Sequence, residues 1–316
     1  MRVSRRFSNF SVTLAALLIA GAAACDAEAP TAAGIPAFDG GEALRLIETQ
    51  VAFGPRVPGT EAHGAMAEWL EGELETRGAK VSIRPFGGVS ALTGEALSGT
   101  NLIASYRTDL DERIFFGAHW DSRALADRDP DPLRRGEPVM GANDGASGVA
   151  VLLVLAEMMR RDPPPVGVDL LLFDLEDQGE SGSEEGYCLG SRALAAGAAI
   201  TGFRPEYGVV IDMVGHRDLT IYRERASLQC CARLVEKVHD TGARISPERF
   251  PEAGLVELYD DHVPWIEAGI PAIVLAGTGF PEWHTTADRP GICDAASLGA
   301  VGELLAHLVW GGHEIP

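Results

Sequence analysis

The chain has 316 residues, of which 46% are hydrophobic and 23% are charged. These proportions are ordinary for a globular protein and exclude an intrinsically disordered, collagen-like or disulfide-dense small protein. Lys and Arg number 26 against 46 Asp and Glu, which gives a formal net charge of −20. No basic block is present that could neutralise phosphates, so we do not expect a nucleic-acid partner.

Residues 1–24 have the pattern of a signal peptide. Three arginines and no acid lie in residues 1–11, and residues 12–24 form an apolar run that is short for a membrane-spanning helix. Cys25 follows three alanines, as in the cleavage box of a bacterial lipoprotein, although Ala22 stands where Leu is usual. We therefore expect export to the cell envelope, periplasmic or attached to the membrane through a lipidated Cys25, or secretion with Cys25 unmodified.

The rest of the chain divides into a linker and one domain. Residues 25–38 are rich in Ala and Pro and are expected to form a flexible tether. Residues 39–316 contain no internal repeat and no second zone of composition, which favours a single α/β domain. Hydrophobic periodicity and turn residues predict, in chain order, helix 41–53, helix 60–77, strand 80–86, strand 101–106, strand 113–118, helix 145–161, strand 168–173, helix 186–199, strand 209–213, strand 219–222, helix 226–243, helix 261–268, strand 271–276 and helix 294–311.

Several predicted strands are apolar on consecutive residues, as at 170–173 and 209–211. Such strands are typical of a mainly parallel sheet, because helices then cover both of its faces. The alternation of strands and helices points to the same class. We therefore expect a three-layer α/β/α sandwich around a mixed, mostly parallel central sheet.

The cysteines after the signal peptide would lie in an oxidising compartment if the protein is exported. They are Cys188, Cys230, Cys231 and Cys293. Four cysteines allow more than one pairing, and the sequence does not choose between them. No Cys-x-x-Cys occurs, so a thiolate zinc site or a thioredoxin-like redox motif is not supported.

Polar side chains follow three predicted strands directly. They are His119 and Asp121 after the first, Asp174, Glu176 and Asp177 after the second, and Asp212 at the third. Because the carboxyl ends of parallel strands meet at one edge of a sheet, these groups are expected to lie close together. A glycine-rich turn at 141–148 adds Asp144, and the loop after strand 271–276 adds His284.

Taken singly, each of these residues is more often a helix cap, a turn residue or a solvated charge than a ligand. Their convergence on one edge favours a metal site. Imidazole and carboxylate are donors that Zn²⁺ takes, and a catalytic zinc keeps an open position. The adjacent acids Glu176 and Asp177 allow a division of roles, in which one carboxylate binds metal and the other carries a proton.

The motifs resemble one family of enzymes. HWDS at 119–122, GANDGASG at 141–148, FDLED at 173–177, VIDM at 210–213 and WHT at 283–285 resemble the co-catalytic zinc aminopeptidases of the bacterial leucyl aminopeptidase type. AHWDSR at 118–123, ADRDPDP at 126–132, CLGSR at 188–192, DDHVP at 260–264 and FPEWHT at 280–285 resemble their glutaminyl-peptide cyclotransferase branch, the glutaminyl cyclases. The match covers about residues 52–290, in order.

The resemblance implies a role for each matching residue. The three zinc ligands would be Asp144, Asp177 and His284, and Glu176 would be the general acid/base. Asp212 and Asp260 would belong to a hydrogen-bonded network beside the scissile amide. In the aminopeptidases His119 and Asp212 would bind a second zinc ion that Asp144 bridges, whereas the cyclotransferases are generally described with one.

The resemblance also implies that Trp283 and Phe280 line the substrate pocket. Trp120 is expected either to form a further wall or to pack in the core. The sequence departs from the animal cyclotransferases in having Asp177 where they have Glu, and no aromatic residue at 178–186. The missing aromatic residue changes the expected packing around a substrate glutamine.

Two acidic segments allow more than one interpretation. Residues 127–132 are expected to form a lid or wall near the site, although the acids there could equally belong to a solvated loop. Asp260 and Asp261 match the family motif, although two acids also suit the positive end of a helix.

The implied activity is conversion of the N-terminal Gln of peptides or proteins to pyroglutamate with release of ammonia. The substrate's own α-amine is the nucleophile, so no Ser or Cys nucleophile is needed, and no GxSxG motif is present. The alternative is an exported di-zinc aminopeptidase, in which Glu176 activates water. A third interpretation is a non-catalytic binding domain that has kept the fold.

Overall fold

The computed structural model describes residues 34–314. The predicted signal peptide, Cys25 and most of the predicted tether lie outside the described residues. Residues 34–39 form neither helix nor strand, and Ile35 and Phe38 pack against the hydrophobic core. The elements are α1 Gly40–Ala52, α2 Glu61–Thr76, β1 Lys80–Val89, β2 Ala96–Tyr106, β3 Arg113–His119, α3 Ala146–Arg161, β4 Gly167–Phe173, α4 Leu189–Thr201, β5 Gly208–Asp212, β6 Arg223–Glu224, α5 Arg225–Ile245, β7 Leu255–Val256, α6 Val263–Glu267, β8 Ala272–Ala276, the 3₁₀ helix η1 Pro290–Ile292 and α7 Ala295–Trp310.

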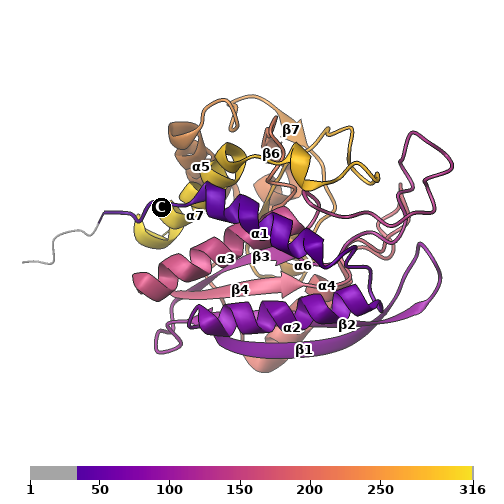
Figure 1. Cartoon of the computed structure of the whole chain (residues 1–316). Coiled ribbons are helices and arrows are strands. Elements are labelled where there is room, and N and C mark those ends of the chain that lie inside the picture. Colours follow the sequence, from indigo (N-terminus) through magenta and orange to yellow (C-terminus); the bar gives the residue numbers. More distant parts are fainter. Residues whose placement is uncertain (1–33, 315–316) are drawn as a thin grey trace, which may run out of the picture. The chain divides into compact units, whose positions relative to one another are not determined.

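Six strands form the central sheet in the order β1-β2-β4-β3-β5-β8. Strands β4, β3, β5 and β8 run parallel, whereas β2 is antiparallel to both β1 and β4. The carboxyl ends of β3, β4, β5 and β8 therefore meet at one edge of the sheet (Figure 1). The expected α/β sandwich around a mixed, mostly parallel sheet is confirmed.

The two faces of the sheet are covered by different helices. Phe116, Leu170 and Val209 belong to a core cluster that includes residues of α1, α2, α3, α5 and α7. Their chain neighbours Phe115, Leu171 and Val210 belong to a second cluster with α4 and α6. Because successive side chains of a strand point to opposite faces, apolar residues are needed at consecutive positions.

Several elements differ from the prediction: β2 begins at Ala96 instead of residue 101, and the two-residue strands β6 and β7 were not predicted. The predicted strand at 219–222 is wrong, since it contributes only an isolated bridge between Ile221 and Gly277. Leu219 and Ile221 are apolar because they are buried in the first core cluster as part of a loop. The helix predicted from residue 186 begins at Leu189, since Cys188 has a left-handed backbone with φ of 57°.

The cysteine pairing that the sequence left open is a bond between adjacent residues. Cys230 and Cys231 form a disulfide in α5, where the backbone of Cys231 is not helical. Cys188 and Cys293 are free and buried. Within residues 34–314, none of the helices combines the length and the apolar character that crossing a bilayer requires.

Candidate metal centre and active site

The structure brings the predicted metal ligands together at the carboxyl edge of the sheet. β3 ends at His119 and β5 ends at Asp212. Asp177 follows β4, Asp144 lies in the turn before α3, and His284 lies in the loop after β8. All five side chains are buried.

The five residues form two groups that share Asp144. The ligand atoms of Asp144, Asp177 and His284 all lie within 4.8 Å of one another, and so do those of His119, Asp144 and Asp212. One carboxylate oxygen of Asp144 lies 3.0 Å from Nε2 of His119, and the other lies 3.6 Å from Nε2 of His284. Asp144 therefore presents one oxygen to each group.

These distances fit zinc. Two ligand atoms that each lie about 2.1 Å from one tetrahedral ion are about 3.4 Å apart. Nε2 of His284 lies 3.3 Å from Oδ1 of Asp177, and Nε2 of His119 lies 3.2 Å from Oδ1 of Asp212. Burial raises the pKa of Asp144, and the charges of Asp177 and Asp212 raise it further. Buried acids that face one another in this way call for a compensating cation.

The backbone around the site is held in an uncommon conformation. Four residues have φ between 49° and 57°, in the left-handed region that residues other than Gly rarely adopt: Leu175, Cys188, Met213 and His284. Leu175 precedes Glu176, Met213 follows Asp212, and His284 is itself a candidate ligand. Such conformations cost of order 1–3 kcal/mol each and are concentrated at functional sites.

The glycine at the start of α3 allows a close approach of backbone and imidazole. Gly145 has φ of +85°, and a Cβ atom there would lie 2.8 Å from Cε1 of His119 and 2.9 Å from the carbonyl oxygen of Asp121. Any other residue would push His119 away from Asp144. This is the physical reason for glycine directly after Asp144.

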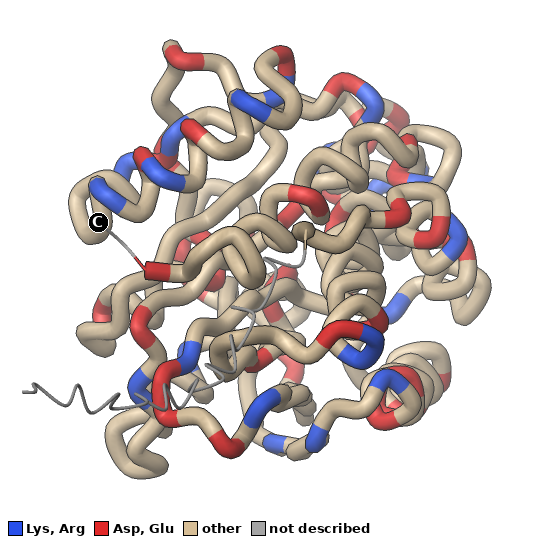
Figure 2. Tube along the Cα trace, turned by 90° about the vertical axis from the view of Figure 1, so that its left-hand side faces the viewer, with Lys and Arg blue, Asp and Glu red and all other residues tan. Residues whose placement is uncertain are grey.

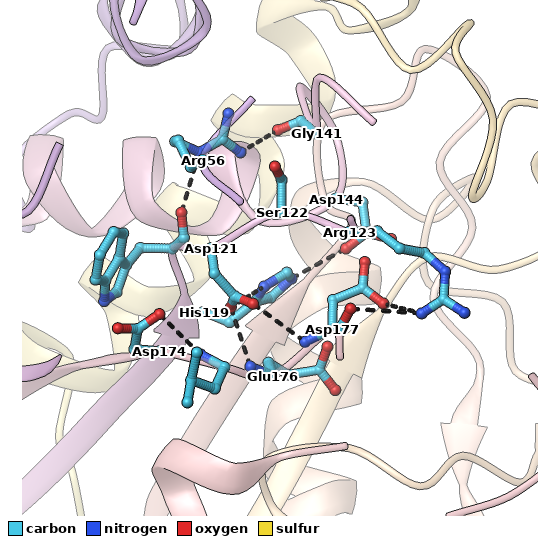
Figure 3. Close-up of polar contacts among 12 residues, drawn as sticks. Arg56, His119, Asp121, Ser122, Arg123, Gly141, Asp144, Asp174, Glu176 and Asp177 are labelled. Carbon is cyan, nitrogen blue, oxygen red and sulfur yellow. Dashed lines mark hydrogen bonds and ion pairs between the residues drawn. The ribbon is translucent and has the colours of Figure 1, made fainter. Parts of the chain in front are cut away.

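Three further buried residues, for which no role was predicted, fix the ligand-bearing segments; Figure 3 shows two of them, Arg56 and Asp121. Asp121 accepts hydrogen bonds from the backbone N–H of Glu176 at 3.0 Å and of Asp177 at 3.4 Å. Arg56 donates to the carbonyl oxygens of Trp120, Met140 and Gly141. Asp288 accepts from the backbone N–H of Asn143 and of Asp144. The only signal in the sequence is the position of Asp121 inside the HWDS motif.

Arg123 holds the carboxylate of Asp177 (Figure 3). Its guanidinium donates to Oδ1 of Asp177 at 2.7 Å and to both oxygens of Asp127, at 2.7 and 3.0 Å. Although burial acts to raise the pKa of Asp177, His284 and Arg123 lower it to about 2. Asp177 is therefore charged and oriented, as a metal ligand must be.

Glu176 has a different environment from the adjacent Asp177. Its carboxyl lies outside both candidate metal groups and accepts a hydrogen bond from the thiol of Cys188 at 3.3 Å. Burial raises the pKa of Glu176 well above its usual range, and although His119 opposes this, Asp261 and Asp177 add to it. A carboxyl whose pKa is raised in this way holds a proton more readily than an exposed Glu, as a general acid/base requires.

The two acids of the DDHVP segment lie inside the site. Asp260 and Asp261 are both buried, and burial raises the pKa of each. Asp260 accepts a hydrogen bond from the backbone N–H of Asp261 at 2.6 Å, and Asp261 accepts one from the hydroxyl of Ser191. Neither carboxylate caps α6. The helix-start interpretation therefore does not account for them.

The three aromatic residues proposed as pocket walls lie in different surroundings. Trp283 is half-buried, and its ring centroid lies 3.9 Å from that of His284. Phe280 is half-buried and stacks on His216 at 4.2 Å. Trp120 is fully buried in the first core cluster and stacks on His63, so core packing describes it.

The acidic loop at 127–132 is tied to the candidate site. Asp129 accepts hydrogen bonds from the backbone N–H of Thr286 at 3.0 Å and from its hydroxyl at 2.6 Å. The backbone N–H of Arg128 donates to the carbonyl oxygen of His284 at 3.2 Å. The loop therefore forms a wall beside His284, in agreement with the first of its two interpretations.

Comparison with known proteins gives a consistent result. Residues 101–309 match peptidase family M28. The chain is 24% identical over 268 residues to a glutaminyl-peptide cyclotransferase from Drosophila melanogaster, a match that covers 77% of this chain and 73% of the relative.

Solved bacterial structures are similar over more of the chain. A glutaminyl cyclase from Tannerella forsythia superposes with a TM-score of 0.83 and 35% identity, covering 88% of this chain and all of the other. A leucine aminopeptidase precursor from Bacteroides thetaiotaomicron gives a TM-score of 0.83 and 33% identity, covering 88% of this chain and 99% of the other. The family match, the shared fold and the arrangement of the site agree: the chain belongs to peptidase family M28.

Proposed function

We propose that this protein is a zinc-dependent glutaminyl-peptide cyclotransferase, which converts the N-terminal Gln of peptides or proteins to pyroglutamate and releases ammonia. The observation that carries the proposal is the position of Glu176, a buried carboxyl next to a candidate ligand but outside both metal groups. The similarity to glutaminyl cyclases from bacteria and animals supports it.

Asp144, Asp177 and His284 would hold the catalytic zinc ion. When bound, the ion would act as a Lewis acid toward the γ-carbonyl oxygen of the substrate glutamine. Arg123 keeps the carboxylate of Asp177 in place, and Asp288 fixes the turn that carries Asp144. These contacts keep the ligands preorganised.

Glu176 would carry the proton. The substrate's α-amine forms a bond to the carbonyl carbon (Cδ) of its own side-chain amide, and the bond from that carbon to the amide nitrogen breaks. Glu176 accepts the proton that the attacking amine loses and donates it to the departing nitrogen, which leaves as ammonia. The raised pKa of Glu176 suits both transfers, and such catalysis typically contributes about 10²- to 10⁴-fold in rate.

The other site residues would bind and orient the substrate. Asp212 and Asp260 are buried acids that can accept hydrogen bonds from the amide nitrogen. Trp283 and Phe280 would provide apolar walls that hold the side chain in a folded shape, with the amine close to the carbonyl carbon (Cδ) of the side-chain amide.

A specific observation favours a second candidate function, that of a di-zinc aminopeptidase. His119, Asp144 and Asp212 form a second group of buried ligand atoms within 4.8 Å of one another. With both groups loaded, Glu176 would take a proton from water instead of from the substrate's amine.

A paired assay on purified protein with zinc quantified separates these functions. One arm follows ammonia release and loss of the free amine from a Gln-initiated peptide, and the other follows release of free amino acid from Leu-initiated peptides. We expect pyroglutamate formation that is lost in Glu176→Gln and retained in the control Glu180→Gln, an exposed acid of the next loop. Free amino acids in place of pyroglutamate would make the protein an aminopeptidase.

The location of the protein stays a prediction, because the segment that determines it lies outside the described residues. We propose export, with a lipid on Cys25 when the signal peptide is cleaved before it. The mass of the N-terminal peptide of the mature protein tests this directly.

A further inference from the structure

Arg128 is an exposed cation placed beside the candidate active site. Its backbone N–H donates to the carbonyl oxygen of His284 at 3.2 Å, which fixes the position of its Cα atom. The central carbon of its guanidinium lies 4.4 Å from the centroid of the Trp283 ring. This cation–π contact holds the side chain over an aromatic ring that itself touches His284.

The donors of Arg128 are available to a ligand. Across residues 34–314, no carboxylate forms an ion pair with its guanidinium and no acceptor takes a hydrogen bond from it. Other arginines of the same loop are engaged, since Arg123 binds Asp177 and Arg134 lies 3.3 Å from Glu137. Arg192 is held over Tyr259 in a comparable way, but it donates to the tyrosine hydroxyl. Arg128 differs because all the N–H donors of its planar guanidinium are free of partners among residues 34–314.

Arg128 lies on the path from the metal centre to solvent. Exposure increases from buried His284 to half-buried Trp283 to exposed Arg128. A substrate whose N-terminal residue occupies the centre must lead its following residues outward. The guanidinium of Arg128 lies 4.4 Å from the centroid of the Trp283 ring, which in turn lies 3.9 Å from that of His284. Arg128 is therefore placed one side chain further from the centre, where it can contact the residues that follow the N-terminal residue of the substrate.

The positive charge of Arg128 acts by itself. Acidic and basic residues are interspersed along the chain in Figure 2, so a preference for charged substrates would have to come from individual contacts. The centre itself consists of acids and histidines, and the α-amine of a substrate would lie there. A guanidinium further out favours a negative charge, and its planar geometry suits bidentate binding of a carboxylate.

We propose that Arg128 is a specificity-determining residue that binds a substrate carboxylate beyond the N-terminal residue. The preferred substrates are peptides with Asp or Glu at the second or third position, or short peptides whose C-terminal carboxylate falls at the same level. The inference rests on the proposed function insofar as it places a peptide N-terminus at the metal centre.

The test compares matched peptides on the zinc-loaded protein at low and high salt. C-terminally amidated Gln-Glu-Ala and Gln-Gln-Ala differ only in the charge of the second residue, and the Gln-Leu dipeptide as acid or amide tests the C-terminal carboxylate. We expect a preference for the charged member of a pair of about two- to fivefold in kcat/KM, which is the range of one solvent-exposed ion pair. In Arg128→Gln the ratio should approach one, and higher salt should reduce it in the unaltered protein.

Arg134→Gln is the control, because it removes the same charge from the same loop and should leave the ratio unchanged. Affinities of the same peptides for the Glu176→Gln protein, measured by calorimetry, separate this inference from the proposed function. If no peptide is turned over, the proposed function fails, while the ratio of affinities still tests Arg128. The inference is overturned if the ratio between charged and neutral peptides is the same in Arg128→Gln and in the unaltered protein. It is also overturned if the unaltered protein does not prefer the charged peptide.

Discussion

The carboxylate of Asp288 accepts a hydrogen bond from the backbone N–H of Asp144 at 3.1 Å. The same carboxylate accepts a second bond, at 2.8 Å, from the N–H of Asn143. Asp288 lies four positions after His284 in the chain. One buried acid therefore connects the loop of one candidate ligand to the turn that carries the ligand shared by both metal groups.

Replacing Asp288 should weaken zinc binding. In Asp288→Asn only the amide oxygen can accept, so one of the two N–H groups loses its partner and the turn loosens. Loss of a residue that orients a metal ligand in this way typically costs about 10- to 100-fold in metal affinity. Competition with a chelator of known affinity measures the change. Asp240→Asn, an exposed position on α5, is the control, and equal zinc affinity in both variants would contradict the role of Asp288.

Arg123 should contribute strongly to stability, most of all without metal. Its side chain is fully buried, and Arg123→Met leaves the charge of Asp177 without its partner. Breaking a buried pair in this way typically costs about 3–5 kcal/mol in the free energy of unfolding. Bound zinc compensates part of the charge on Asp177, so the loss should be larger after chelation.

Urea unfolding with and without chelator tests this prediction. Arg134→Met breaks an exposed pair with Glu137 and should cost less than about 1 kcal/mol. Equal losses in Arg123→Met and Arg134→Met would show that the burial of the first pair has no energetic consequence.

The sequence predicts the elements of this fold well because burial on two faces leaves a local signal. Runs such as 170–173 are apolar on consecutive residues, and the polar residues that follow them mark the edge where the site lies. The strand order cannot be predicted in this way. It depends on which strands pair across long separations, as β3 does with both β4 and β5. The error at 219–222 has a related cause, since an apolar loop and a short strand give the same pattern.

Four of the five candidate ligands were predictable because each lies at or shortly after the end of a strand or in a glycine-rich turn, whereas His284 was predicted from the WHT motif in the loop after the last strand. The residues that orient them were not. Asp121, Asp288 and Arg56 act on backbone N–H and carbonyl groups of distant segments, and such contacts exist only once the chain is folded. A side chain that binds backbone also needs no particular residue type as its partner, so no paired pattern appears in the sequence.

Gly145 should be required for the site for two reasons, its backbone conformation and the close approach of the His119 imidazole. Gly145→Ala places a methyl group 2.8 Å from the imidazole of His119 and strains a residue with φ of +85°. Gly269→Ala strains a residue with φ of +78°, but nothing lies within 4 Å of the new Cβ. We expect both variants to lose about 1–2 kcal/mol of stability from the strain. Only Gly145→Ala should also lose activity, by about tenfold or more, because His119 is displaced.

Steady-state kinetics and thermal unfolding of the two glycine variants separate these effects. A similar loss of activity in Gly269→Ala would indicate that strain alone is responsible. Unchanged activity in Gly145→Ala would mean that the approach of the backbone to His119 has no functional consequence.

Glu224 should make the stability of the protein depend on pH in the acidic range. It accepts hydrogen bonds from the N–H groups of Ala226 and Ser227 at the start of α5, and it lies 3.0 Å from the imidazole of His262. Although burial acts to raise the pKa of Glu224, these contacts lower it from 4.5 to about 2. A carboxyl whose pKa is lower in the folded state stabilises the protein fully above pH 4.5, and this contribution is lost as the pH falls toward 2.

Glu224→Gln should therefore be less stable than the unaltered protein at neutral pH, and its stability should fall less steeply between pH 4.5 and pH 2. Urea unfolding of chelated protein at several pH values measures both effects without zinc release. Glu257→Gln is the control, because Glu257 is exposed and pairs with Arg225 at 3.1 Å. Parallel pH dependence in Glu224→Gln and the unaltered protein would contradict the assignment. Because His262 directly follows Asp260 and Asp261, a loss of stability at Glu224 should also loosen the acids that the proposed reaction uses.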